Sequence, residues 1–250
     1  MKPVYVICFY WQGERWQEQG MNYDKVEDPG FRKHLARTGP LTHEMVCRYV
    51  DNLYFGVKKW AVHPFKFICF TNDDLDVDER IEIREFQSVV KEGVMPRMFM
   101  YSKAAGLFGH QVLCLDIDVV ITGSLRDLMN YDGLYCTRTS FAGPDKGKLD
   151  GDIQSFQAGK EMEDIFWKPL IDDPEKAKEI SQGRERFWVR HVMNGKADLW
   201  NDVAPDQVLS YKRHVMKNNK ELPENARIIS CHGHPRPHII NEQWRKDNWE

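Results

Sequence analysis

Three features are missing from this sequence: closely spaced cysteines, a long apolar run, and an excess of charge of one sign. The six cysteines are scattered without a C-x-x-C pair, which argues against a zinc site and favours a reducing compartment. No apolar run approaches the ~18 residues of a transmembrane helix, and the first residues lack a signal-peptide pattern. The formal net charge is −3, so no global field favours nucleic acid. We therefore expect a cytoplasmic protein that binds no nucleic acid.

Length and composition favour one globular domain over residues 1–250. With 42% hydrophobic side chains, the chain can bury a substantial core without a second domain. Residues 11–40 stand apart, because their glycines and charges make them a poor core builder. A connection of about 30 residues is far longer than ordinary loops and is typical of lids and binding loops. We predict a flap over the active site there, with an inert insertion as the alternative.

Alternating strand and helix patterns predict an α/β fold. A helix is expected from Thr42, a suitable N-cap, to Trp60, because apolar residues recur there at three- and four-residue steps. Further helices are expected over 96–109 and within 204–219. Runs typical of strands occupy residues 3–10, 65–70, 80–86, 110–121, 133–139 and 227–231. Strands that alternate with helices indicate a mixed, mostly parallel central sheet flanked by helices.

The run LCLDIDVVITGSL, residues 113–125, places Asp116 and Asp118 inside an otherwise hydrophobic stretch. If the run is one strand, both carboxylates project to the same face. Unpaired carboxylates inside a covered sheet cost on the order of several kcal/mol, so we expect the pair where the strand emerges, at the edge where ligands bind. Hard carboxylate oxygens suit Mg²⁺ or Mn²⁺. The alternative is a salt-bridged or solvated strand end.

Two classes of enzyme carry a D-x-D pattern after an apolar run. One is the haloacid-dehalogenase-like phosphatase, in which the first acid is a nucleophile and the second a general acid. That class has the motif on its first strand and a later lysine followed by an acidic pair. Here the motif follows three predicted strands, and the downstream DGDI lacks those surroundings. The phosphatase is therefore the less favoured reading.

The other class is the nucleotide-sugar-dependent glycosyltransferase of the GT-A type, and this resemblance extends along most of the chain. YVDNLYFGVKKW…FKFICFTND resembles the first helix and second strand of that class, VLCLDIDVVITGSLRDL its metal-binding strand, and ISCHGHPRPH its C-terminal element. The order of these elements is more specific than the D-x-D pair alone. The chain is similar in its motifs to family 8 enzymes and to uncharacterised bacterial and phage members of the group.

The resemblance implies a divalent cation, Mn²⁺ or Mg²⁺, as cofactor. Asp116 and Asp118 match the metal and nucleotide ligands, and His232 is implied as a third metal ligand. The match departs from the family at one point, because the family histidine precedes the glycine by three positions and this sequence has Ser230 there. The implied donor is a nucleoside-diphosphate sugar, most simply a UDP-sugar.

Further donor contacts are implied by the same resemblance. Arg97 matches a basic residue before the metal strand and would contact the phosphates or the sugar; a solvated helix arginine is its alternative. Thr71, Asn72 and Asp73 would line the base or ribose, although turn chemistry alone also explains these residue types. Arg236 would clamp the departing diphosphate.

The acceptor side is less defined by the sequence. An inverting reaction needs a carboxylate base near the acceptor hydroxyl, and Asp152 in LDGDIQSF or Glu185 in GRERF could supply it. The expected acceptor is a glycan or a lipid-linked hydroxyl, so a peripheral membrane association stays open. A catalytically silent sugar-nucleotide or glycan-binding protein of the same fold is the rival from another functional class.

Overall fold

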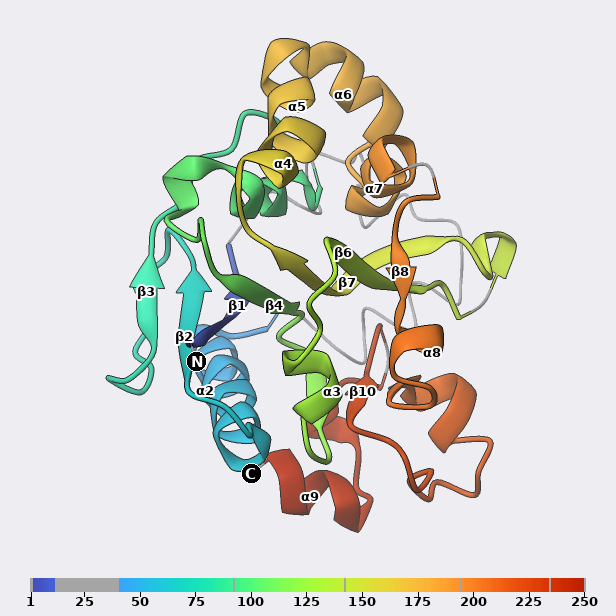
Figure 1. The fold of residues 1–250 in the computed structure, drawn as a ribbon. Helices are drawn as coiled ribbons and strands as arrows, with labels where there is room; N and C mark the ends of the chain where they lie inside the picture. Colours follow the sequence, from blue (N-terminus) through green and yellow to red (C-terminus); the bar gives the residue numbers. More distant parts are fainter. Residues whose placement is uncertain are drawn as a thin grey trace, which may run out of the picture.

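The computed structural model describes residues 2–11, 41–91, 93–141, 143–193, 195–233 and 235–249 (Figure 1). Two sheets and the helices around them make up this part of the chain. The predicted flap falls almost wholly at residues 12–40, outside the described residues. No helix within the described ranges has the length and apolar character needed to cross a membrane.

A mixed sheet of seven strands runs through the centre of the described chain, in the order β3-β2-β1-β4-β7-β6-β8. The strands are β1 (Val4–Phe9), β2 (Phe65–Phe70), β3 (Glu82–Arg84), β4 (Gln111–Leu115), β6 (Tyr135–Thr139), β7 (Leu149–Gln157) and β8 (Asp198–Leu199). Strands β3, β2, β1 and β4 are parallel, whereas β7 runs antiparallel to both β4 and β6. The predicted α/β class with a mostly parallel mixed sheet is confirmed.

A smaller sheet lies beside the main one and contains β5 (Val119–Ile121), β10 (Ile228–Ser230) and β9 (Val208–Ser210). Strand β10 pairs antiparallel with β5 and parallel with β9. The chain therefore leaves the main sheet after β4 and enters the small sheet at β5. This transfer brings the C-terminal segment next to the residues that follow β4.

Helices cover both sides of the main sheet (Figure 1). The group α4 to α7 lies on one side, and α2, α3 and α9 lie on the other. The α-helices are α2 (His43–Trp60), α3 (Arg126–Met129), α4 (Lys160–Met162), α5 (Lys168–Asp172), α6 (Pro174–Ser181), α7 (Glu185–Met193), α8 (Trp200–Val203) and α9 (Gln243–Trp249). Single turns of other types are η2 (Met95–Tyr101), η3 (Lys103–Ala105), η4 (Gly143–Asp145), η5 (Glu163–Trp167), η6 (Tyr211–Val215) and η7 (Pro237–Ile239).

The longest of these helices, α2, begins and packs as its sequence predicts. The Thr42 side chain accepts a hydrogen bond from the Met45 amide at 3.2 Å, which caps the first turn. Its apolar stripe, which includes Val46, Val50 and Leu53, is fully buried against the sheet.

Two hydrophobic clusters fill the two faces of the main sheet. Alternate residues of β1 enter opposite clusters: Val4, Val6 and Cys8 one of them, Ile7 and Phe9 the other. This alternation follows from the two-residue period of a strand covered on both faces. All six cysteines are buried and unpaired, as small hydrophobes in these clusters or beside them.

Three predicted elements differ from the structure. The helix expected over 96–109 consists of the two 3₁₀ turns η2 and η3, because all of η2 is buried and has no polar face to turn toward water. The helix expected within 204–219 yields to β9 and the π-turn η6, since pairing with β10 outweighs the local pattern. The strand expected over 110–121 is broken in two, with consequences for the site.

Candidate functional site

Asp116 and Asp118 occupy the turn between β4 and β5, so the two acids do not belong to one strand. The inference that strand alternation points them to the same face is therefore wrong. Their predicted location is right, because β4 ends at Leu115 and Asp116 follows at its carboxyl end. The turn is fixed from the C-terminal side, where the Cys231 amide donates to the Asp118 carbonyl at 3.2 Å.

Arg97, in η2, forms an ion pair with Asp116 and with a second acid. Its Nη1 donates to Asp116 Oδ1 at 2.6 Å and lies 3.1 Å from Oε2 of Glu185, the first residue of α7. The side chains of Arg97 and Glu185 are 7% and 4% exposed, whereas that of Asp116 is 37% exposed. Arg97 is therefore a buried charge of the site, and the alternative of a solvated helix arginine is wrong.

A buried amide fixes Glu185 in turn. Gln154 of β7 donates from Nε2 to Glu185 Oε1 at 2.5 Å, and its Oε1 accepts hydrogen bonds from the Tyr101 and Tyr135 hydroxyls. Burial raises the Glu185 pKa to about 7, although Arg97 and Gln154 favour its charged form. The second predicted catalytic acid is thus held inside the protein, at the inner edge of the site.

Asp152, also on β7, lies in a second buried ion pair. Arg138 of β6 donates from Nη2 to Asp152 Oδ2, and the Ser230 hydroxyl donates to the same oxygen at 3.2 Å. The other oxygen, Oδ1, is buried and has no hydrogen-bond partner among the described residues. Because Leu115 pairs with Ile153 across β4 and β7, Asp152 comes next to Asp116. Asp152 therefore adds negative charge beside the D-x-D pair.

The charge around Asp116 is unbalanced. Its pKa is raised to about 8, first by burial and then by the acids Asp118, Asp152 and Glu185, against the opposing effect of Arg97. Water reaches part of this side chain, which is 37% exposed, and this contact weakens the effect of burial. An added cation at this point would relieve the repulsion.

Residues from the C-terminal segment complete the outer side of the site. Arg236 Nη1 lies 3.8 Å from Asp118 Oδ2, with the two side chains 22% and 18% exposed. His232 Nε2 is 2.8 Å from the Ser210 hydroxyl, and its ring stacks on Phe141 at 6.0 Å between centroids. The structure thus places Arg236 beside Asp118.

His232 remains neutral at physiological pH. Burial, together with the positive charges of Lys212 and Arg138, lowers its pKa to about 4. A neutral imidazole is the form that ligates metals. However, no three His, Cys, Asp or Glu side chains of the described part of the chain are grouped closely enough to hold a metal ion as they stand.

The turn after β2 is held by its own hydrogen bonds. Thr71 Oγ1 accepts from the Asp73 amide at 3.0 Å, and the Asn72 amide group bonds both the N–H and the carbonyl of Phe86. Thr71 is buried. These contacts show a structural role for two of the three predicted nucleotide-binding residues, at the carboxyl end of β2 beside β1.

The donor set fits a divalent cation with one rearrangement. Asp116 and Asp118 supply hard oxygen ligands, and the unpartnered Asp152 Oδ1 lies on the neighbouring strand. The surplus of negative charge favours a cation, but Arg97 already bonds one Asp116 oxygen. A metal at that oxygen would compete with Arg97 for the negative charge of Asp116.

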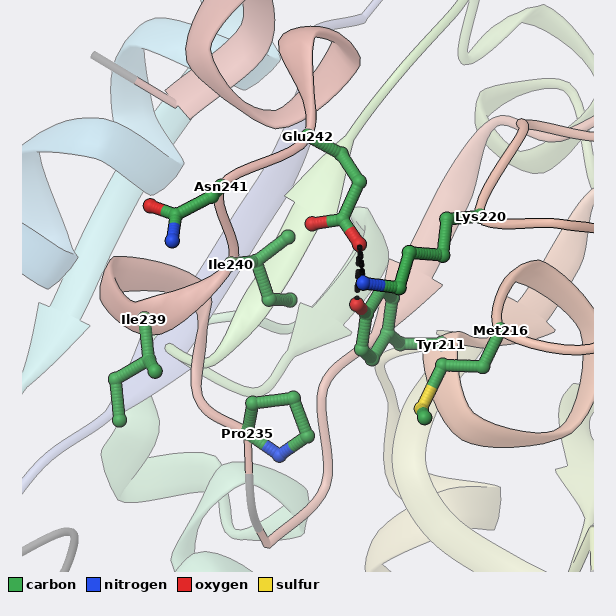
Figure 2. A pocket seen from close by; sticks show the side chains of 8 residues that line it. All are labelled: Tyr211, Met216, Lys220, Pro235, Ile239, Ile240, Asn241 and Glu242. Atoms are coloured by element: carbon green, nitrogen blue, oxygen red, sulfur yellow. Dashed lines mark hydrogen bonds and ion pairs between the residues drawn. The ribbon is translucent and has the colours of Figure 1, made fainter.

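A cavity of about 440 Å³ lies next to Arg236, toward the C-terminus (Figure 2). Its wall combines apolar side chains with an ion pair, in which Glu242 accepts from the Tyr211 hydroxyl at 2.7 Å and lies 3.7 Å from Lys220. The lining residues are Tyr211, Met216, Lys220, Pro235, Ile239, Ile240, Asn241 and Glu242. Asp116 and Asp118 do not line this cavity, and its link to the site is Pro235, the residue before Arg236.

Comparison with known proteins identifies the fold. No protein-family model and no curated protein sequence matches the chain. Among solved structures, an active-site mutant of LgtC superposes with a TM-score of 0.62 at 10% identity, over 98% of this chain and 93% of that one. Glycosyltransferase GlyE of Streptococcus pneumoniae TIGR4 gives 0.59 at 13% identity, over 98% of this chain.

The chain spans 60% of the length of GlyE and nearly the whole of LgtC. A third structure, galactosyltransferase LgtC in complex with donor and acceptor sugar analogues, gives a TM-score of 0.55 at 10% identity. These neighbours are GT-A-type glycosyltransferases, and the chain has their fold. The fold expected from the sequence resemblance is thereby confirmed.

Sequence reasoning missed two residues of the site, Arg138 and Gln154. Both are buried: Gln154 on β7, which pairs with β4, holds Glu185, and Arg138 on β6, which pairs with β7, holds Asp152. A signal was present, because a charged and an amide side chain inside runs of strand length, TRT and DIQSF, need partners once buried.

Proposed function

We propose that this protein is a metal-dependent glycosyltransferase that moves a sugar from a nucleoside-diphosphate sugar to a hydroxyl acceptor. The observation that carries the proposal is a GT-A fold in which Asp116 and Asp118 follow β4 and two arginines reach them from different segments. Carboxylates and arginines at this edge of a sheet suit a cation and a diphosphate.

Asp116 and Asp118 would hold the cation, with His232 as a third ligand. A bound Mn²⁺ or Mg²⁺ would neutralise the charge that develops on the leaving diphosphate. The protein contributes Arg236, whose guanidinium lies beside Asp118 and is partly exposed to an incoming ligand. Its charge would stabilise the leaving group most in the transition state, where the diphosphate charge is largest.

Asp152 is the better of the two predicted acids for a role at the acceptor. Both Glu185 oxygens are engaged, Oε1 by Gln154 and Oε2 by Arg97. Asp152 keeps Oδ1 without a partner in the described structure and lies beside Asp116. We assign Asp152 to polarise or deprotonate the acceptor hydroxyl, and Glu185 to hold Arg97.

We propose a UDP-sugar as donor, from the family 8 resemblance, and a glycan or lipid-linked acceptor. The LgtC complex with donor and acceptor sugar analogues supports a two-substrate site in this fold. The apolar and polar walls of the cavity beside Arg236 suit a glycoside, which has both kinds of surface.

Donor turnover tests the proposal directly. The protein would be incubated with Mn²⁺ and a panel of nucleoside-diphosphate sugars, and the released nucleoside diphosphate would be measured with and without simple glycosides. Release that requires Mn²⁺ is the expected result. Binding without any release would favour the silent sugar-nucleotide binder, and phosphate release from simple phosphate esters would favour the phosphatase.

A further inference from the structure

Arg97 is shared between an exposed acid and a buried one. Its Nη1 donates to Asp116 Oδ1 at 2.6 Å and lies 3.1 Å from Glu185 Oε2. Removing one partner from a buried ion pair is strongly destabilising, because the remaining charge is left uncompensated. Asp116 can therefore be given over to another cation only if Arg97 keeps a second counter-charge.

Glu185 is fixed so that it can serve as that counter-charge. Gln154 bonds its other oxygen at 2.5 Å, and the Tyr101 and Tyr135 hydroxyls fix the amide of Gln154. Gly151 leaves room for the carboxyl group, since a Cβ at this position would lie 2.9 Å from the Glu185 carboxyl carbon. The carboxylate is thus held at Arg97 by contacts that do not involve Asp116.

We propose that Glu185 is a positioning residue that retains Arg97 when a divalent cation takes the Asp116 carboxylate. Without the cation, Arg97 bridges both acids; with it, Arg97 stays with Glu185 and the Asp116 oxygen becomes available. One positive charge replaces another at Asp116, and no buried charge is left without a partner. The inference rests on the proposed function, because it takes Asp116 to be a cation ligand.

A double-mutant cycle on Mn²⁺ affinity tests this exchange without any enzyme turnover. At a pH of about 8, where Glu185 is charged, free Mn²⁺ would be followed by electron paramagnetic resonance in the wild type, Glu185→Gln, Arg97→Gln and the double variant. Glu185→Gln is expected to raise the Kd for Mn²⁺ about tenfold, because Arg97 then has Asp116 as its remaining acid. In the Arg97→Gln background the same change is expected to alter the Kd less than about twofold.

An equal rise in both backgrounds would mean that Glu185 acts on the cation only as a distant charge, and it would overturn the proposal. Gly151→Ala provides a test that removes no charge, since its methyl group would push the Glu185 carboxyl aside. It should raise the Kd for Mn²⁺ severalfold. The matched control is Gly159→Ala, because a Cβ there meets nothing within 4 Å and the φ of 177° is extended. Wild-type affinity in Gly151→Ala would count against the exchange even if the charge variants fail to fold.

Donor turnover separates this inference from the proposed function. Mn²⁺ binding that shows the coupling, without turnover of any donor, would support the exchange and overturn the transferase. Turnover by a wild-type protein that binds no Mn²⁺ would overturn the exchange and leave sugar transfer standing.

Discussion

The two arginines that reach the D-x-D acids stand in different surroundings. Arg97 is 7% exposed and bonds Asp116 at 2.6 Å, whereas Arg236 is 22% exposed and lies 3.8 Å from Asp118. The inner arginine has a second acid, and its position is set by the core elements η2, β7 and α7. The outer one comes from the C-terminal segment, which is tied to the turn at Cys231. We call Arg97 with its core partners the inner half of the site, and Arg236 with the C-terminal segment the outer half. The inner half is fixed by the core, whereas the outer half is suited to contact a ligand.

This comparison predicts the largest effect at Asp118, the acid beside Arg236. Asp118→Asn should weaken Mn²⁺-dependent UDP binding more than about a hundredfold, because a nearly isosteric amide removes the charge that attracts the cation. Binding would be measured by calorimetry with and without Mn²⁺. Asp132→Asn, an exposed change after α3, is the control. Unaltered metal dependence in Asp118→Asn would show that the site is assigned to the wrong residues.

Replacing the outer arginine should slow the reaction more than it weakens binding. Arg236→Ala is expected to lower kcat on the order of a hundredfold and to change KM much less, because the charge on the leaving diphosphate grows in the transition state. Steady-state kinetics with the active donor would measure both constants. Arg126→Ala, on the exposed surface of α3, serves as control. An effect confined to KM would assign Arg236 to donor binding.

The inner half predicts a pH effect on stability. The Glu185 pKa is raised from 4.5 to about 7, so its contribution to stability is full below pH 4.5 and is lost as the pH rises through about 7. Glu185→Gln does not titrate. Its free energy of unfolding should therefore gain about 3 kcal/mol relative to wild type between pH 4.5 and 7, and little above that range.

Denaturant unfolding at several pH values would measure this difference. Glu161→Gln, an exposed change on α4, is the control. A constant difference for Glu185→Gln would mean that Glu185 is charged at all of these pH values.

The contrast between the two halves also shows which features the sequence could predict. The parallel strands β1 and β2 and the capped helix α2 follow from local patterns, because each buries an unbroken apolar run or stripe. The break between β4 and β5 does not follow, since DIDVVI has the composition of one strand and only pairing with β10 moves its second half into another sheet. The partners of Arg97 come from segments far apart in the chain, which no local pattern reveals.

The smallest of the expected effects concerns His232. His232→Ala should raise the Kd for Mn²⁺ about tenfold, well below the loss in Asp118→Asn, because a neutral imidazole adds a ligand without adding charge. To bind the cation through Nε2, the ring must give up its contact with the Ser210 hydroxyl. Otherwise it must bind the cation through Nδ1. Ser210→Ala distinguishes these two routes. Tighter Mn²⁺ binding in that variant would mean that Nε2 is the ligating atom, and unchanged binding would point to Nδ1.

The exposed His191→Ala is the control. If His232→Ala binds Mn²⁺ as the wild type does, His232 is no ligand, and its stacking on Phe141 and its bond to Ser210 are then its role in the fold.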